Sequence, residues 1–192
     1  YNKNFKSNNA FINTKNELKI LSISQVTPRK GIRYLFEGLN YLSKKYDVKL
    51  TLIGNASGKM EKYLKSYKKD FEINWIRKIN HKKIVEYYKK SNLFILLSTE
   101  EGLPSVFKEC LISGLPIIGS KESGSEDLVS IGNCYCINKE SKSDLLITIE
   151  NILNNKSSSK TFIDDKKIKK FNLDIIKKWK KLLLKNDFTI ND

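Results

Sequence analysis

A short apolar run, Leu93–Leu97, passes directly into a loop and then a helix pattern, and this succession constrains the fold more than any other feature. A run without polar residues is typical of a strand buried on both faces of a parallel sheet. Thr99–Leu103 is predicted to be a loop, and Pro104 suits the first helical position, where a missing amide hydrogen costs no intrahelical bond. Gly114 suits the end of the helix. The apolar positions recur at helical spacing: Val106, Phe107, Cys110 and Leu111.

The same succession of strand, loop and helix occurs earlier in the chain. We expect strands over Leu18–Ile23, Val48–Gly54 and Ile73–Ile76. The loop Ser24–Gly31 precedes a helix with one apolar stripe: Ile32, Leu35, Phe36, Leu39 and Leu42. This alternation predicts an α/β fold, with a Rossmann-like parallel sheet flanked by helices. A chain of 192 residues can bury one sizeable core, so we expect one such domain over residues 18–154.

Two further segments flank this domain. Residues 1–17 are interpreted as a lead-in or linker, and residues 155–192 as a basic linker followed by an amphipathic helix. The polar stretch Asn154–Ser159 has the composition of a flexible linker. The helix is expected from about Leu173 to Lys185. Its apolar side would be formed by Leu173, Ile176, Trp179, Leu182 and Leu183.

Two carboxylates lie on either side of the helix start that follows Leu93–Leu97. The first amides of a helix attract a phosphate, and those of Leu103, Ser105 and Val106 would do so here. Glu109 would lie about 7–8 Å further along the helix axis, where a carboxylate can accept hydrogen bonds from ribose hydroxyls. Glu101 would face the other end of the ligand and accept from sugar hydroxyls. The spacing fits a nucleoside diphosphate sugar.

These residues resemble the retaining nucleotide-sugar glycosyltransferases of the GT-B fold, in the family 4-like group marked by two glutamates with seven residues between them. The resemblance implies that Glu101 contacts the donor sugar and that Glu109 holds the ribose. It implies donor contacts from the backbone of the residues after Glu101: Gly102, Leu103, Pro104, Ser105 and Val106. Ordered elements over about residues 18–154 carry the resemblance.

The loop after the first strand matches the family in part. In the family an arginine, and a lysine five residues later, hold the diphosphate. Lys30 matches the lysine, while Gln25 stands at the arginine position and can hydrogen-bond a phosphate without neutralising it. Arg29 is the neighbouring cation that could compensate. The resemblance therefore implies catalytic roles for Lys30 and Glu101, with no metal, because amides and basic side chains take the charge of the departing diphosphate.

Two further segments follow the order of the family. The backbone of the family segment that corresponds to Ile79–Tyr88 reads the nucleotide base, so Ile79 is the candidate base contact. Arg77 stands where the family usually has glycine. Gly124 and Asp127 match a glycine-rich turn before an acidic residue.

The resemblance implies that the chain is the C-terminal, donor-binding half of an enzyme, without the N-terminal domain that binds the acceptor. Such an enzyme transfers a sugar from a nucleotide donor with retention of configuration, as in polysaccharide biosynthesis. Two alternatives stay open. A nucleotide-sugar epimerase shares the fold but needs acid and base carboxylates at the sugar. A non-catalytic nucleotide-binding or interaction module would fit Gln25 at the arginine position.

The net charge of +15 allows three interpretations. The lysine-rich tail is either a solvated helix face, a contact with an anionic membrane surface, or a nucleic-acid contact. Nucleic acid is not expected as a partner, because no DNA- or RNA-binding motif accompanies the charge. No stretch reaches the roughly 18–20 apolar residues of a membrane span, so we expect a cytoplasmic protein, peripheral at the inner membrane face if the tail binds lipid.

The cysteines and the histidine do not predict a metal site. Cys134 and Cys136 would share one face of a strand, but no second pair completes a zinc site. We expect these thiols and that of Cys110 to be buried and reduced. The lone His81 is interpreted as a surface residue, and it excludes a cluster of several histidines.

Overall fold

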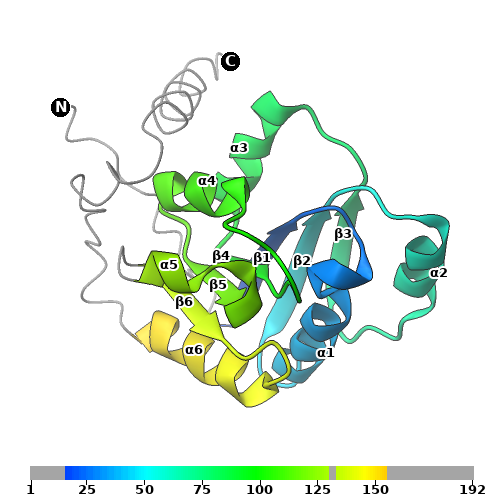
Figure 1. The fold of residues 1–192 in the computed structure, drawn as a ribbon. Helices are drawn as coiled ribbons and strands as arrows, with labels where there is room; N and C mark the ends of the chain where they lie inside the picture. The colour runs from blue at the N-terminus through cyan, green and yellow to red at the C-terminus, as the bar shows by residue number, and fades with distance from the viewer. Residues whose placement is uncertain (1–15, 130–132, 155–192) are drawn as a thin grey trace, which may run out of the picture.

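The computed structural model describes residues 16–129 and 133–154, which form a six-stranded parallel sheet flanked by helices (Figure 1). The strand order is β3-β2-β1-β4-β5-β6. The strands are β1 (Glu17–Ile23), β2 (Asp47–Ile53), β3 (Glu72–Ile76), β4 (Leu93–Leu96), β5 (Ile117–Ser120) and β6 (Cys134–Ile137). The helices are η1 (Pro28–Lys30), α1 (Ile32–Leu42), α2 (Gly58–Ser66), α3 (His81–Lys90), α4 (Ser105–Ser113), η2 (Lys121–Ser123), α5 (Glu126–Val129) and α6 (Lys142–Asn154). This is the predicted Rossmann-like α/β fold.

The order of the strands reverses between β1 and β4. The chain builds outward from β1 through β2 to β3, and then returns to place β4 on the other side of β1. In the register, Ile20 lies opposite Leu93 and Leu21 opposite Phe94. In sheets of this kind, ligands bind outside the carboxyl ends of the strands at the point of reversal. That point lies between the loop after β1 and the loop after β4.

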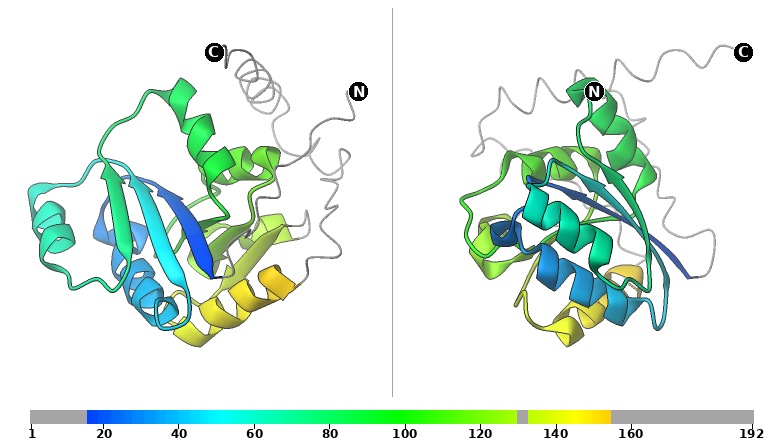
Figure 2. Two further views of the ribbon diagram at one scale, coloured as in Figure 1. Left: turned by 180° about the vertical axis from the view of Figure 1, so that it is seen from behind. Right: turned by 90° about the vertical axis from the view of Figure 1, so that its right-hand side faces the viewer.

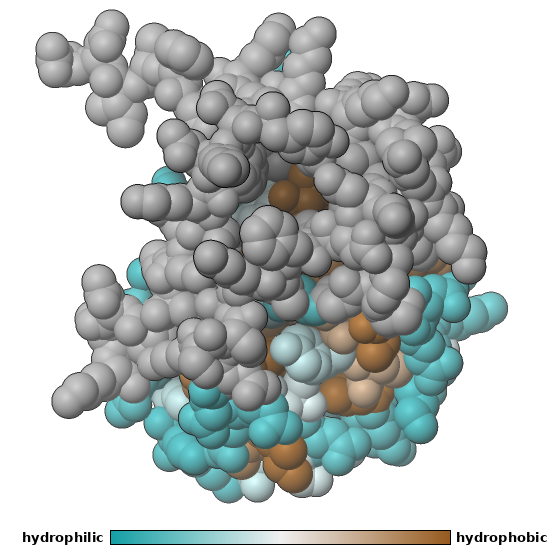
Figure 3. Space-filling model, turned by 90° about the vertical axis from the view of Figure 1, so that its left-hand side faces the viewer, coloured by the Kyte–Doolittle hydropathy of each residue, from teal (hydrophilic) through white to brown (hydrophobic). Residues whose placement is uncertain are grey.

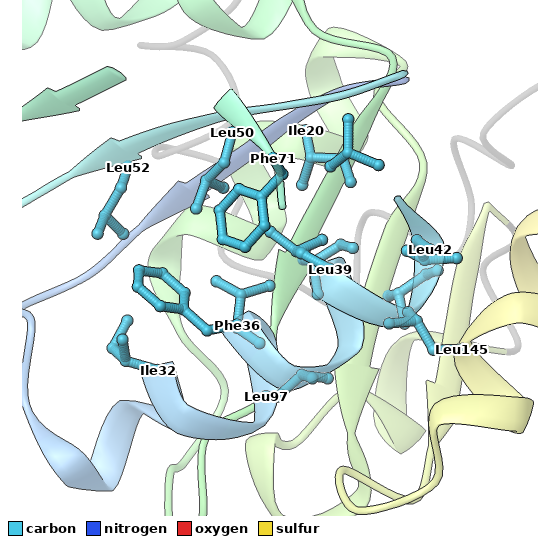
Figure 4. Close-up of a cluster of buried hydrophobic side chains, with 14 of the residues drawn as sticks. Ile20, Ile32, Phe36, Leu39, Leu42, Leu50, Leu52, Phe71, Leu97 and Leu145 are labelled. Atoms are coloured by element: carbon cyan, nitrogen blue, oxygen red, sulfur yellow. The ribbon is translucent and has the colours of Figure 1, made fainter. Parts of the chain in front are cut away.

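Helices cover both faces of the sheet (Figure 2). One core lies under α1, α2 and α6, and it contains Phe36, Leu39 and Leu145 (Figure 4). The other core lies under α3, α4 and α5, and it contains Val85 and Phe107. The central strands are buried on both sides, which explains why their sequences are nearly continuous apolar runs.

The helix patterns follow from these two cores. All the stripe residues predicted for α1 are buried: Ile32, Leu35, Phe36, Leu39 and Leu42. Gly38 lets α6 approach α1, because a Cβ atom at that position would lie 2.6 Å from Cδ2 of Leu145. Gly114 ends α4 in the left-handed conformation with φ of +73°, as predicted.

One side of the molecule carries hydrophobic surface. Figure 3 views the side on the left of Figure 1, where hydrophobic patches lie among hydrophilic residues. Among the described residues, the large apolar side chains that remain exposed are Val129 and Ile147, at 47% and 55%. No helix in the described ranges is long and apolar enough to cross a bilayer.

The predicted boundaries need small corrections. Pro104 was predicted as the first helical residue, but it is the N-cap of α4, with an extended ψ of 138°, and the helix begins at Ser105. The fixed φ of proline, about −65°, suits either position, so the sequence did not separate them. Leu97 and Gly54 lie just beyond the ends of β4 and β2. The lead-in over residues 1–17 and the basic linker and helix over 155–192 lie, except for residues 16 and 17, outside the described residues.

Candidate functional site

Loops from three neighbouring strands meet at the carboxyl edge of the sheet. They are residues 24–31 after β1, residues 97–104 after β4, and the turn containing η2 after β5. The amide of Thr99 donates to the carbonyl of Arg29 at 2.8 Å, and the amide of Glu101 donates to the carbonyl of Glu122 at 2.9 Å. Backbone hydrogen bonds thus join the loop after β4 to the loops after β1 and β5. They bring together the predicted site residues Lys30 and Glu101.

Two glycines make this close assembly possible. Gly31 has φ of +66°, and a Cβ atom there would lie 1.7 Å from the carbonyl oxygen of Leu97. Gly124 has φ of +70°, and its Cβ atom would lie 3.1 Å from the carbonyl oxygen of Gly102. A side chain at Gly31 would both strain the backbone and push the first two loops apart. Gly124, singled out in the sequence, therefore packs against the residues that follow Glu101.

Lys30 and Glu101 form an ion pair at the point of strand reversal. Their side chains are only 15% and 21% exposed, so the pair is largely shielded from water. Burial lowers the pKa of Lys30 and the charge of Arg29 adds to this effect, while the Glu101 carboxylate favours the charged ammonium. The site therefore contains a cation that can bind a phosphate and a carboxylate that can accept from hydroxyl groups, and the two side chains contact each other.

The start of α4 borders this ion pair. Its N-cap, Pro104, makes no side-chain hydrogen bond to the first turn, so the helix lacks the usual cap for its first amides. Ser105 and Gly102 are exposed, and a Cβ atom added to Gly102 would meet no protein atom within 4 Å. Leu103 is partly buried and Val106 is buried. Open space thus lies beside the backbone that is predicted to contact the donor.

Glu109 on α4 is buried, unlike most carboxylates on the surface of a helix. It is 7% exposed, and the hydroxyl of Tyr88 on α3 donates to its Oε2 atom at 2.6 Å. Burial raises the pKa of Glu109 to about 7, although the hydrogen bond from Tyr88 favours the charged form. Near neutral pH this carboxyl group therefore changes charge readily.

The remaining predicted residues lie around the same edge. Gln25 and Arg29 are exposed in the loop after β1, and the Arg29 carbonyl also accepts from the Thr99 hydroxyl at 3.2 Å. Ile79 is partly buried between β3 and α3, and it packs against the core under α3, α4 and α5. Arg77 makes two hydrogen bonds to Glu61, of 2.8 and 2.5 Å, and lies 4.6 Å from the Trp75 ring centroid. Those contacts join Arg77 to α2, on which Glu61 lies.

Some residues of this site were missed in the sequence. The sequence analysis named Tyr88 only as the end of the segment Ile79–Tyr88. Tyr88 belongs to the same buried stripe as Ile84 and Val85, and a buried tyrosine hydroxyl usually needs a hydrogen-bond partner, so the pattern contained a signal. Glu122 binds the loop through its backbone, which no side-chain pattern reveals. The hydroxyl oxygen of Ser98 is buried without a hydrogen-bond partner at the end of β4.

Cysteines and acids give no metal site in the described ranges. No group of three or more His, Cys, Asp or Glu side chains there could hold a metal ion. Cys110 and Cys134 are buried free thiols, while Cys136 is only partly buried. His81 is exposed, as predicted.

Comparison with known proteins identifies a family. The model of the family described as "Glycosyl transferases group 1" matches residues 4–169. An uncharacterized glycosyltransferase of Haemophilus influenzae is 31% identical over 178 residues, which are 85% of this chain and 48% of that protein. The amylovoran biosynthesis glycosyltransferase AmsK of Erwinia amylovora is 28% identical over 123 residues, which are 58% of this chain and 30% of that protein.

Solved glycosyltransferase structures share the fold. The apo form of the lipopolysaccharide outer core galactosyltransferase WaaB matches with a TM-score of 0.68 at 18% identity, over 92% of this chain and 51% of that one. A UDP-forming α,α-trehalose-phosphate synthase from Burkholderia xenovorans matches with a TM-score of 0.65 at 13% identity, over 88% of this chain and 44% of that one. The chain spans about half the length of the Haemophilus influenzae protein and about a third of the length of AmsK. The family model covers most of this chain, and the chain belongs to the group 1 glycosyltransferases.

Proposed function

We propose that this chain is the nucleotide-sugar-binding part of a glycosyltransferase that transfers a sugar with retention of configuration. The observation that carries the proposal is the Lys30–Glu101 ion pair at the strand reversal, beside the start of α4. A nucleoside diphosphate sugar offers an anion for Lys30 and hydroxyl groups for Glu101. The family membership supports sugar transfer as the reaction.

The charges of this site suit the proposed reaction. When the bond from the sugar to the diphosphate breaks, positive charge grows at the sugar and negative charge grows on the leaving phosphate. Lys30 and the uncapped amides at the start of α4 would stabilise that negative charge. Glu101 would position the sugar, and Glu109 would add binding energy from the ribose, far from the bond that breaks. Lys30 and these amides would supply positive charge to the leaving diphosphate, so we propose that the reaction needs no metal.

The candidates for the donor and the acceptor come from the names of related proteins alone. A related solved structure is described as bound with UDP-2-fluoro glucose, and AmsK is named for amylovoran biosynthesis. A UDP- or GDP-linked hexose and a polysaccharide acceptor are therefore the first candidates. Because the chain matches about half of a longer relative, we propose that an N-terminal acceptor domain completes the enzyme.

Calorimetric titration of this chain tests the donor site directly. We expect UDP, GDP or one of their hexose conjugates to bind, and Lys30→Ala to weaken binding about 10- to 100-fold, because a hydrogen bond to a charged group contributes about 1.5–3 kcal/mol. Lys62→Ala is the matched control, since Lys62 is exposed on α2 and away from the strand reversal. Loss of binding in both lysine variants would point to net charge alone rather than to the site.

If the folded chain binds none of these nucleotides, the proposed donor site is refuted. Retention is tested separately, by following the anomeric configuration of the product by NMR with the enzyme that includes its acceptor domain. An inverted product would contradict the proposed stereochemistry while leaving donor binding intact. Binding without any transfer by that enzyme would favour a non-catalytic module.

A further inference from the structure

Tyr88 and Glu109 are two buried polar side chains that join α3 to α4 through one hydrogen bond of 2.6 Å. Tyr88 is 2% exposed and Glu109 is 7% exposed, within the core under α3, α4 and α5. We propose that Tyr88 is a positioning residue, which holds the Glu109 carboxyl group in place for the ribose of the donor and favours its charged form. This inference rests on the proposed donor site.

The geometry leaves one side of the carboxylate for a ligand. Tyr88 donates to Oε2, and no hydrogen bond reaches Oε1 of Glu109 within the described residues. Both side chains are packed in a core, so neither can turn without disturbing its neighbours. The carboxylate plane is therefore fixed before the ligand arrives, and ordering it on binding costs little further entropy.

The direction of the hydrogen bond is set by the two proton affinities. Burial raises the pKa of Tyr88 far above its usual value, so its hydroxyl keeps the proton and acts as the donor. Burial also raises the pKa of Glu109, to about 7, and the Tyr88 hydroxyl counteracts that rise. Without this hydroxyl, the carboxyl group would be neutral over more of the physiological range.

The two thiols that pack near this pair stay neutral. Cys110 lies beside Glu109 on α4, and burial raises the pKa of its thiol well above the usual value. Cys134 reaches the same core from β6, where burial raises its pKa to about 12. Among these described groups, Glu109 is the one that changes charge near pH 7.

A pH dependence of donor binding follows from this arrangement. The charged carboxylate accepts hydrogen bonds from ribose hydroxyls, whereas the protonated form has lost acceptor capacity. Donor affinity should therefore rise as the pH increases through about 7. Removal of the Tyr88 hydroxyl should move that rise to a higher pH, because the charged form loses its hydrogen bond.

The test is a titration of the full chain with UDP-glucose, or GDP-glucose if guanine is the preferred base, from pH 6 to about 8.5. These conjugates have no phosphate group that titrates in that range, so the profile reports the protein. The variants are Tyr88→Phe, Glu109→Gln and, as the matched control, Tyr87→Phe on the same helix. We expect Tyr88→Phe to bind about 10-fold more weakly at pH 7, the effect of about 1.4 kcal/mol, and to reach full affinity only at higher pH.

A second probe separates positioning from simple stability. The 2′-deoxyribose form of the same nucleotide lacks one of the proposed hydroxyl partners, so Tyr88→Phe should weaken its binding less than that of the ribose form. Glu109→Gln should bind both forms weakly with no pH dependence, and Tyr87→Phe should behave as the unmodified protein. Thermal unfolding of each variant verifies that the chain is folded at the titration temperature.

Three results would overturn the inference, and each has a different meaning. If the unmodified chain binds no nucleotide, the proposed donor site fails and the role of Tyr88 fails with it. If Glu109→Gln weakens binding while Tyr88→Phe retains the original pH profile, the donor site stands and the positioning role is refuted. If Tyr88→Phe weakens the ribose and deoxyribose forms equally without a shift in pH, Tyr88 contributes packing only.

Discussion

Glu109, the proposed ribose contact, illustrates how a buried carboxyl group lowers the stability of the folded chain. Its pKa lies at about 7 in the folded chain, against a reference of 4.5, because burial disfavours its charge. Below about pH 4.5 both states carry the proton, so this group has no adverse effect. Between pH 4.5 and about 7 only the unfolded state releases this proton, so stability falls across that range by an amount on the order of 3 kcal/mol, and the whole loss is present above about pH 7.

We therefore expect Glu109→Gln to increase the free energy of unfolding at pH 8. The glutamine carbonyl can still accept the hydrogen bond from Tyr88, while the buried charge is gone. The gain should be a few kcal/mol at most at pH 8 and close to zero at pH 4.5. Urea unfolding at the two pH values measures both.

A surface glutamate provides the control for this measurement. Glu86 is exposed on α3, with Lys90 as its partner at 4.0 Å, so Glu86→Gln should change stability by less than about 0.5 kcal/mol at either pH. An equal gain from both variants would mean that net charge, and not burial, sets the effect. A loss of stability in Glu109→Gln at pH 8 would contradict the raised pKa.

At the scale of elements, the loop after β1 is held against the end of β4 through Gly31. Gly31→Ala combines an unfavourable left-handed backbone with a Cβ atom 1.7 Å from the Leu97 carbonyl oxygen. The loop must move, and it carries Lys30 away from Glu101. We expect the free energy of unfolding to fall by more than about 2 kcal/mol, as measured by urea unfolding. We also expect weaker nucleotide binding, as measured by calorimetry.

Gly58→Ala is the matched control for Gly31→Ala. Gly58 begins α2, and a Cβ atom there meets no protein atom within 4 Å. Alanine is favoured in a helix, so this variant should be unchanged or more stable by up to about 1 kcal/mol. If Gly31→Ala kept normal stability and affinity, the close approach would not be what positions Lys30.

The elements themselves were largely predictable, because their apolar periodicity is local. The strand over residues 18–23, the stripe of α1 and the stop at Gly114 all appear where the sequence indicates. The Lys30–Glu101 contact joins residues 71 positions apart, so it depends on which strands are neighbours, and periodicity does not encode that order. The link between Tyr88 and Glu109 depends likewise on how α3 packs against α4.

The strand order explains why residues from separate loops come together at one edge of the sheet. The parallel strands all end at one edge, and the reversal between β1 and β4 leaves their loops side by side (Figure 1). Residues after β1, β4 and β5 then meet through short backbone contacts. The fold thus creates the edge at which we propose that the donor binds, while the particular side chains would determine which ligand is bound.

The net charge of +15 belongs to the whole chain, and much of it lies in the tail over residues 155–192, whose structure is not described. We expect the full chain to bind vesicles that contain phosphatidylglycerol, but not vesicles of phosphatidylcholine alone, and to be released by high salt. A variant with glutamine at Lys177, Lys178, Lys180 and Lys181 should bind up to about 1000-fold more weakly, at about 1 kcal/mol for each lysine. Vesicle co-sedimentation measures this.

The control carries the same loss of charge elsewhere, with glutamine at four lysines of the α2 region: Lys59, Lys62, Lys65 and Lys68. Both variants have a net charge of +15 − 4 = +11, so a difference between them isolates position from total charge. Equal weakening would mean that the general field of the protein attracts the membrane. If neither kind of vesicle is bound but single-stranded DNA is, in a salt-dependent way, the tail serves nucleic acid. If nothing is bound, the tail lysines recognise neither a membrane nor nucleic acid.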